Sequence, residues 1–198
     1  MIDQQQDLSL HVSDALIAVD VQNDFLPGGS LAVAQGDEVV PILNDYIHRF
    51  ASKGLPVFAT RDWHPADHCS FRERGGPWPS HCIAGTKGAE FASGLALPPQ
   101  AEVISKAAQP DRDAYSGFEG TDLARRLRRS GVQRVFIGGL ATDYCVFNTV
   151  KDALKEGFVT VLLLDAVRAV DVRPGDGQAA IAQMLGTGAK PGRLESIR

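Results

Sequence analysis

The stretch that decides the fold is Arg134-Val-Phe-Ile-Gly-Gly-Leu-Ala-Thr-Asp-Tyr-Cys145, which joins an apolar run to an amphipathic segment. The run at its start reads as a buried strand. Residues 143–156 then repeat apolar and small side chains at helical spacing, and Gly157 ends the pattern. A buried strand that leads directly into such a helix is typical of a parallel sheet covered by helices.

The same alternation of strand and helix extends along the chain. Apolar runs predict strands at residues 15–19, 56–60, 102–105, 134–138 and 159–164. Helical spacing predicts helices at 39–50, between Thr121 and Gly131, at 143–156 and at 177–185. Residues 61–97 are rich in proline, glycine and histidine without a clear period, so we expect a long functional loop. We therefore predict an α/β fold: a three-layer sandwich whose central, mostly parallel sheet is flanked by helices.

Length and composition limit the class of protein. A chain of 198 residues predicts a single domain, residues 1–198. The net charge of −4 provides no basic field for nucleic acid or an anionic membrane. Apolar runs such as 159–164 are far shorter than the ~20 residues of a membrane helix. Residues 1–9 are polar and acidic, unlike a secretory signal, and three cysteines without CxxC spacing suit a reducing cytoplasm.

Four candidate reactive residues follow predicted strands: Asp20, Asp62, Lys106 and Cys145. In parallel sheets ligands bind beyond the carboxyl ends of the strands. At the start of a helix, the dipole and free N–H groups favour the Cys145 thiolate and can receive an oxyanion. Asp20 can exchange a proton with this thiol, and Lys106 can hold charge. The alternatives are a buried structural cysteine, an aspartate that caps a turn and a solvated lysine.

A second group of residues suits a metal. Asp62 and His64 are two positions apart, so their side chains can point the same way in an extended segment. With His81 from further along the loop, they form a donor set for zinc, iron or manganese. These histidines can alternatively bond within the loop. For His68, the roles of ligand, outer-shell group and structural residue all stay open.

Aromatic residues fall near the same segments, at Phe25, Trp78, Tyr115 and Phe118. A flat aromatic substrate stacks well between such rings. Ordinary loop packing is the alternative, and it applies to Phe118 more than to Phe25 or Trp78. We therefore interpret the loop region at about 61–97 as binding both metal and substrate.

Taken together, these segments resemble the nicotinamidase/pyrazinamidase family of cysteine amide hydrolases, within the isochorismatase-like superfamily. The resemblance covers residues 14–180. It is carried by Val19-Asp-Val-Gln-Asn-Asp-Phe25, Pro27-Gly-Gly-Ser-Leu-Ala-Val33, Thr60-Arg-Asp-Trp-His-Pro65, Trp78-Pro-Ser-His-Cys82, Tyr115-Ser-Gly-Phe118 and Gly139-Leu-Ala-Thr-Asp-Tyr-Cys-Val146. The resemblance implies the isochorismatase-like hydrolase fold. It also implies hydrolysis of nicotinamide to nicotinate and ammonia through a cysteine thioester, in NAD salvage.

The resemblance further implies roles for individual residues. It implies a triad of Asp20, Lys106 and Cys145, and one metal, zinc first, on Asp62, His64 and His81, with His68 as a further candidate ligand. It implies substrate contacts from Phe25, Trp78 and Tyr115. It suggests a non-proline cis peptide between Leu140 and Ala141 that aims the N–H groups of Ala141 and Cys145 at one point, as an oxyanion hole.

The C-terminal segment departs from the family pattern, which closes with an apolar strand. Here Gly188-Ala-Lys-Pro-Gly-Arg193 takes the place of most of that strand, so its formation stays open. The metal's identity, the choice between monomer and homo-oligomer, and activity on pyrazinamide also stay open. A related hydrolase of another small amide or of isochorismate is the alternative function, and a non-catalytic metal-binding protein is a more distant one.

Overall fold

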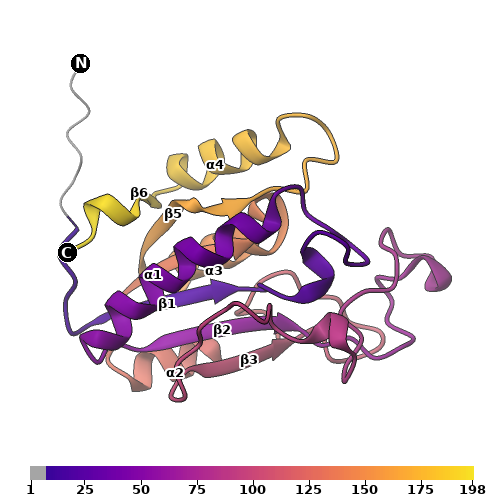
Figure 1. Ribbon diagram of the computed structural model, residues 1–198, viewed down its shortest axis with the longest axis horizontal. Coiled ribbons are helices and arrows are strands. Elements are labelled where there is room, and N and C mark those ends of the chain that lie inside the picture. Colours follow the sequence, from indigo (N-terminus) through magenta and orange to yellow (C-terminus); the bar gives the residue numbers. More distant parts are fainter. Residues whose placement is uncertain (1–7) are drawn as a thin grey trace.

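A computed structural model of the protein describes residues 8–198 and has a six-stranded sheet at its centre (Figure 1). The strands are β1 (Asp14–Val19), β2 (Val57–Asp62), β3 (Glu102–Lys106), β4 (Arg134–Leu140), β5 (Val159–Arg168) and β6 (Lys190–Gly192). They lie in the order β3-β2-β1-β4-β5-β6, and every neighbouring pair is parallel. The predicted α/β sandwich with a central parallel sheet is confirmed. The expectation that residues 1–9 form no signal falls largely outside the described residues.

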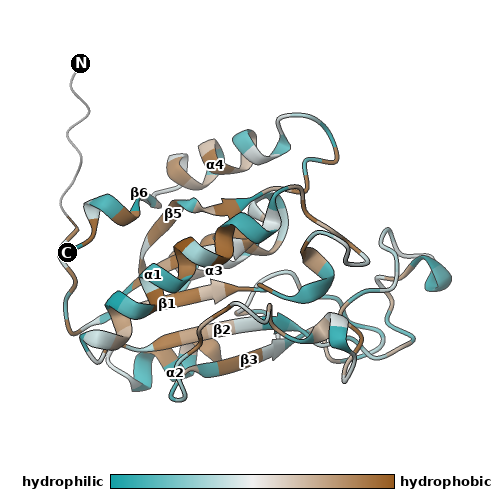
Figure 2. Cartoon of the chain, in the orientation of Figure 1, coloured by the Kyte–Doolittle hydropathy of each residue, from teal (hydrophilic) through white to brown (hydrophobic). Residues whose placement is uncertain are grey.

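Helices cover both faces of the sheet. They are α1 (Val39–Ser52), α2 (Leu123–Arg129), α3 (Phe147–Lys155) and α4 (Asp176–Gly186). The chain moves from β1 through α1 to β2 in one direction across the sheet, and through the other three helices in the opposite direction. Right-handed crossovers therefore place α1 on one face and α2, α3 and α4 on the other. Figure 1 shows α1 in front of the sheet, and Figure 2 shows apolar strands at the centre of the molecule.

The core consists of two layers, one on each side of the sheet. All six residues of β1 are buried, and successive side chains point to opposite faces. Leu16 joins the layer beneath α1, while Ile17 joins the layer beneath α2, α3 and α4. Because helices bury both faces, β1 is an uninterrupted apolar run in the sequence after its first residue, Asp14.

Three strands run two or more residues further than the sequence predicted, and one of them is β4, which continues from Gly138 to Leu140. The prediction ended β2 at Thr60, but its pairing with β3 continues to Asp62 and Lys106. It ended β5 near Asp165, but the strand continues to Arg168 after a shift in its pairing with β4. The Asp165 carboxylate accepts hydrogen bonds from the Tyr46 hydroxyl and the Leu194 N–H, each at 2.8 Å. These two partners, from α1 and from the segment after β6, allow a carboxylate to lie inside the strand.

The unusual C-terminal segment still forms a short sixth strand. Residues Lys190–Gly192 pair with β5, with Gly192 opposite Leu163. A Cβ on Gly192 would lie 2.6 Å from the Val161 side chain, so glycine permits this close approach. After β6, the chain continues to Ile197, which is buried and forms an isolated parallel bridge with Leu8.

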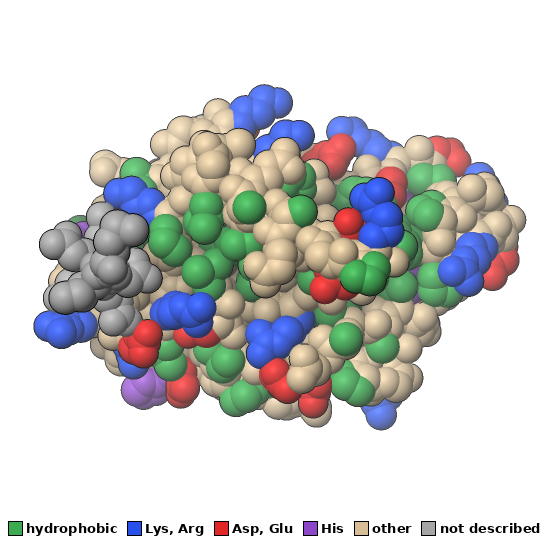
Figure 3. All heavy atoms as spheres, turned by 90° about the horizontal axis from the view of Figure 1, so that it is seen from above, with side chains coloured by type: hydrophobic (Ala, Val, Ile, Leu, Met, Phe, Trp, Pro, Cys, Tyr) green, Lys and Arg blue, Asp and Glu red, His purple; other side chains and the backbone are tan. Residues whose placement is uncertain are grey.

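No described helix is both long and apolar enough to cross a membrane. Figure 3 shows basic and acidic side chains interspersed on the face that is seen from above.

We expect Gly139→Ala to destabilise the protein because β4 passes too close to β1 for a side chain. Gly139 has a φ of +128°, and an added Cβ would lie 2.1 Å from the Val19 carbonyl oxygen. The free energy of unfolding should fall by at least the ~1–3 kcal/mol typical of overpacking. Gly186→Ala is the matched control, since open space surrounds that glycine at the end of α4. Urea denaturation of both variants tests this, and equal stabilities would contradict the packing argument.

Candidate active site

The candidate catalytic residues meet at the point where the strand order reverses. β1 lies between β2 and β4. The chain passes from β1 to β2 on one side, and it reaches β4 on the other side only after β3. Asp20 directly follows β1, and Cys145 lies in the turn after β4. Asp62 and Lys106 are partners at the ends of β2 and β3. Crevices of this kind form ligand sites in parallel sheets, so the topology explains why these residues converge.

A buried ammonium stands at the centre of the cluster. The Lys106 Nζ lies 3.0 Å from an Asp20 carboxylate oxygen and also forms an ion pair with Asp62. It donates to the Ala114 carbonyl at 3.2 Å and lies 3.5 Å from the Cys145 sulfur. The Lys106 and Asp20 side chains have no exposed surface. A charge this deeply buried is stable only when it is paired and hydrogen-bonded, as it is here.

The pKa values of Asp20 and Asp62 are shifted in opposite directions by their surroundings. Burial raises the pKa of Asp20, and the nearby Lys106 ammonium only partly offsets that rise. Burial also acts to raise the pKa of Asp62, but Lys106 and His64 outweigh it, so that pKa is lowered. Burial alone would lower the pKa of Lys106, whereas the two carboxylates raise it. Asp62 is therefore the permanent anion, Lys106 the permanent cation, and Asp20 the carboxyl group suited to carrying a proton.

The position of Cys145 differs from the one predicted. The sequence placed it in the first turn of an α-helix, but it lies in a π-helical turn, Thr142–Val146, that precedes α3. Burial raises the pKa of its thiol, the Lys106 ammonium opposes this, and Asp20 and Asp62 raise the pKa further. The helix-terminus effect expected to favour the thiolate is thus outweighed. The thiol needs a base, and a carboxylate oxygen of Asp20 lies within 4.8 Å of the sulfur.

The turn that carries Cys145 begins with an unusual peptide bond. The bond between Leu140 and Ala141 is cis, as the family resemblance suggested. The Ala141 carbonyl accepts hydrogen bonds from the N–H groups of Tyr144 and Val146, both at 3.1 Å. Ala141 and Cys145 both line the cavity beside the cluster.

Asp62, His64 and His81 form a compact donor set. One potential ligand atom from each lies within 4.8 Å of the others. The Nδ1 atoms of His64 and His81 face the carbonyls of Ala107 at 3.1 Å and Pro79 at 2.8 Å. These partners assign the proton to Nδ1 and leave Nε2 as the free acceptor. The His64 Nε2 is buried without a hydrogen-bond partner among the described residues, so the site fits a metal ion.

His68 lies beside this set, with both of its ring nitrogens engaged. Its ring stacks on His64 with centroids 4.2 Å apart. Its Nδ1 accepts from the Ser70 hydroxyl at 2.7 Å, and its Nε2 contacts the Arg112 carbonyl at 3.1 Å. This bonding favours an outer-shell packing role for His68 among the alternatives that the sequence left open.

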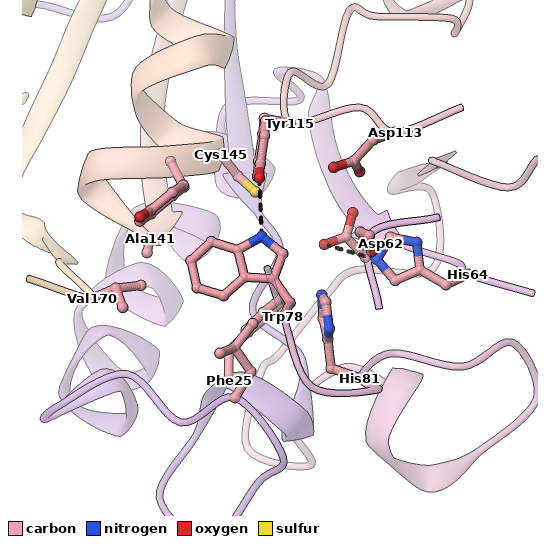
Figure 4. Close-up of a pocket in the computed structure, with 13 residues that line it drawn as sticks. Phe25, Asp62, His64, Trp78, His81, Asp113, Tyr115, Ala141, Cys145 and Val170 are labelled. Atoms are coloured by element: carbon pink, nitrogen blue, oxygen red, sulfur yellow. Dashed lines mark hydrogen bonds and ion pairs between the residues drawn. The ribbon is translucent and has the colours of Figure 1, made fainter. Parts of the chain in front are cut away.

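Aromatic side chains wall the cavity (Figure 4). Phe25, Trp78 and Tyr115 all line it, as predicted. The Trp78 indole N–H donates to the Tyr115 hydroxyl at 3.0 Å. Phe118 does not line this cavity and instead packs near Phe158, with ring centroids 6.1 Å apart.

Several cavity residues escaped the sequence analysis. They are Leu31, Ser70, Asp113, Tyr144 and Val170. The rings of Tyr144 and Trp78 meet edge to face, with their centroids 4.9 Å apart. The place of Tyr144 directly before Cys145 was a signal available in the sequence. The remaining four lie in irregular segments where no periodicity marks which side chains point inward.

The chain is similar to known proteins over most of its length. The model of the isochorismatase domain matches residues 14–196. A nicotinamidase of Acinetobacter baylyi is 38% identical over 198 residues, covering 89% of this chain and 90% of the relative.

Two solved structures superpose closely on the chain. A pyrazinamidase of Pyrococcus horikoshii in complex with zinc is 54% identical, with a TM-score of 0.88, covering 91% of this chain and 99% of that one. PnC1 of L. infantum in complex with nicotinate is 37% identical, with a TM-score of 0.88, covering 96% of this chain and 98% of that one.

We expect Lys106→Met to destabilise the folded state, because it leaves Asp20 and Asp62 buried without a counterion. Removing one partner of a buried ion pair costs about 3–5 kcal/mol. Lys151→Met is the control, since that lysine of α3 is exposed. Urea denaturation measures both free energies of unfolding. If the Lys106 variant is as stable as the control, the ammonium is not the counterion on which the cluster depends.

Proposed function

The chain belongs to the isochorismatase domain family, and on this premise we propose that it hydrolyses nicotinamide to nicotinate and ammonia. The observation that carries the proposal is the meeting of Cys145, Asp20 and Lys106 in one buried cluster at the wall of an aromatic cavity. The nicotinamidase of A. baylyi and the nicotinate-bound PnC1 support this substrate.

The cavity suits a flat heteroaromatic amide. Phe25 and Trp78 pack against the substrate ring, and the hydrogen bond from Trp78 to Tyr115 fixes the indole plane. Tyr144 braces Trp78 from its edge. The carboxamide group of a ring held in this way lies toward Ala141 and Cys145 at the other side of the cavity.

The first half of the reaction forms a thioester. Asp20 takes the proton of the Cys145 thiol, and the sulfur attacks the carboxamide carbon. The N–H groups of Ala141 and Cys145 stabilise the resulting oxyanion, and one such donor typically contributes ~3 kcal/mol. Asp20 then returns the proton to the nitrogen, the C–N bond breaks, and ammonia leaves.

The second half regenerates the thiol. Asp20 removes a proton from water, the oxygen attacks the thioester carbon, and the C–S bond breaks. Asp20 passes that proton to the sulfur, and the acid loses the second proton of the water molecule to solvent and leaves as nicotinate. Throughout, the Lys106 ammonium stabilises whichever of Asp20 and Cys145 is negatively charged, at 3.0 Å and 3.5 Å from the two groups. The raised pKa of Asp20 suits this repeated exchange of a proton.

Asp62, His64 and His81 would hold a divalent transition metal, which would supply a Lewis acid able to bind and orient the pyridine ring of the substrate. One carboxylate and two neutral imidazoles suit zinc, iron or manganese. We propose zinc, with the zinc complex of the P. horikoshii pyrazinamidase as support.

The proposal extends to the wider role of the protein. We propose that residues 1–198 act as one domain on a small molecule, in NAD salvage, because nicotinate is the product. Cys69, Cys82 and Cys145 are all free thiols, which suits the proposed cytoplasmic location.

We expect Cys145→Ala to abolish ammonia release from nicotinamide, because no other group in the cluster can form the thioester. The variant should still bind zinc, since Cys145 is not one of the proposed ligands. Cys69→Ala, outside the cavity, is the matched control and should retain full activity. An ammonia assay with metal analysis tests both. Substantial turnover by the Cys145 variant would rule out the covalent step.

We expect a strong chelator to remove ammonia release and added zinc to restore it, because the ring loses the group that orients it. Activity before and after dialysis against the chelator measures this. Full activity of the metal-free protein would contradict the role given to Asp62, His64 and His81. Release of ammonia from another small amide, but not from nicotinamide, would favour the alternative hydrolase.

A further inference from the structure

The segment that follows β1 contains two polar side chains, those of Gln22 and Asp24, to which the proposed mechanism gives no task. Gln22 has no exposed surface. Its side-chain Nε2 donates to the Asp62 carbonyl at 2.8 Å, and its Oε1 accepts from the Asp62 N–H at 2.8 Å. The same Nε2 donates to the Ala89 carbonyl at 2.9 Å. One carboxamide thus holds the backbone of Asp62 on both sides.

Asp24, two residues further on, holds the backbone beside His81. Its Oδ2 accepts from the Cys82 N–H at 2.7 Å, and its Oδ1 accepts from the Ser30 N–H at 3.2 Å. A Cβ on Gly88 would lie 2.1 Å from the same Oδ2, so the loop packs closely over this carboxylate. The segment therefore contacts the chain at both places from which the proposed metal ligands come.

These contacts matter because the ligands come from different parts of the fold. Asp62 ends β2, whereas His81 lies in the long connection between β2 and β3, where the described chain has only short helical turns. The carboxylate and the imidazole must nevertheless lie within 4.8 Å of each other. Ligands held in advance bind an ion more tightly, because less conformational entropy is lost on binding.

We propose that Gln22 and Asp24 are positioning residues of the metal centre, holding Asp62 and His81 in place and so setting the affinity for the ion. The proposal rests on the ligand set of the proposed function, but not on amide hydrolysis. Mutating the partners that orient metal ligands typically weakens metal affinity by 10–100-fold. Gln22 and Asp24 contact neither sulfur nor ammonium of the catalytic cluster by any hydrogen bond that the described residues show.

The test is the dissociation constant of zinc, measured on the full chain by competition with a chromophoric chelator. For Gln22→Ala and for Asp24→Ala we expect it to rise roughly 10- to 100-fold. Asn23→Ala is the matched control from the same segment. Its side chain donates to the Lys87 carbonyl at 2.7 Å and reaches no backbone next to a proposed ligand. We expect zinc affinity in this control to be unchanged.

Two nearly isosteric variants separate positioning from a general loss of structure. Gln22→Glu keeps an acceptor for the Asp62 N–H but turns an oxygen toward two carbonyls, so zinc affinity should fall although the size is kept. Asp24→Asn keeps an acceptor for the Cys82 N–H and should recover much of the affinity that Asp24→Ala loses. Urea denaturation of the metal-free variants tests whether each of them is folded. Gln22→Met replaces any Gln22 variant that unfolds.

Distinct outcomes bear on each proposal. Unchanged zinc affinity in folded Gln22 and Asp24 variants overturns the positioning proposal. So does an equal loss of affinity in Asn23→Ala, because that result assigns the effect to the segment as a whole. A wild-type protein that binds no zinc removes the ligand set and the positioning proposal together. Normal zinc binding without ammonia release contradicts amide hydrolysis alone and leaves the positioning proposal to be decided by the affinities.

Discussion

The buried Lys106 ammonium is the interaction on which the rest of the site depends. Two carboxylates and a sulfur lie around one cation with almost no access to water. Without that cation, Asp20 and Asp62 would repel each other in a medium that screens poorly. The same ammonium lowers the pKa of Asp62 and only partly offsets the effect of burial on Asp20. One fixed charge thereby gives two chemically identical side chains different tasks.

The parallel sheet explains how such a cluster can form. Asp20, Asp62 and Lys106 are at or directly after the carboxyl ends of strands, and Cys145 lies in the turn that follows β4. The four strands are neighbours, so their carboxyl ends meet at one side of the sheet. The close approach of Gly139 to Val19 brings the turn of Cys145 next to Asp20. The core layers on both faces keep these strands in register, so the packing far from the chemistry fixes the distances within it.

The site also divides its work between rigid and irregular parts of the chain. The catalytic cluster lies on the ends of strands or on the short segments that follow them, while His81, Trp78 and Tyr115 come from connections without long helices or strands. Side-chain hydrogen bonds compensate for that irregularity. Those of Gln22 and Asp24 reach the backbone beside the metal ligands, and that of Trp78 reaches Tyr115. Hydrogen-bonded side chains of this kind restrict the number of conformations that a loop can adopt.

The sequence by itself determined the order of strands and helices, because burial on both faces leaves continuous apolar runs and amphipathic helices leave a period. It also placed Asp20, Asp62, Lys106 and Cys145 at strand ends, and the motifs around them indicated the family. Only the tertiary structure decided the extent of β2 and β5, the short β6 and the π-helical turn at Cys145. It alone showed the inward side chains of Asp113 and Val170, and the hydrogen bonds of Gln22 to the Asp62 backbone. Those features depend on contacts between residues far apart in the chain, and no local pattern of side chains encodes them.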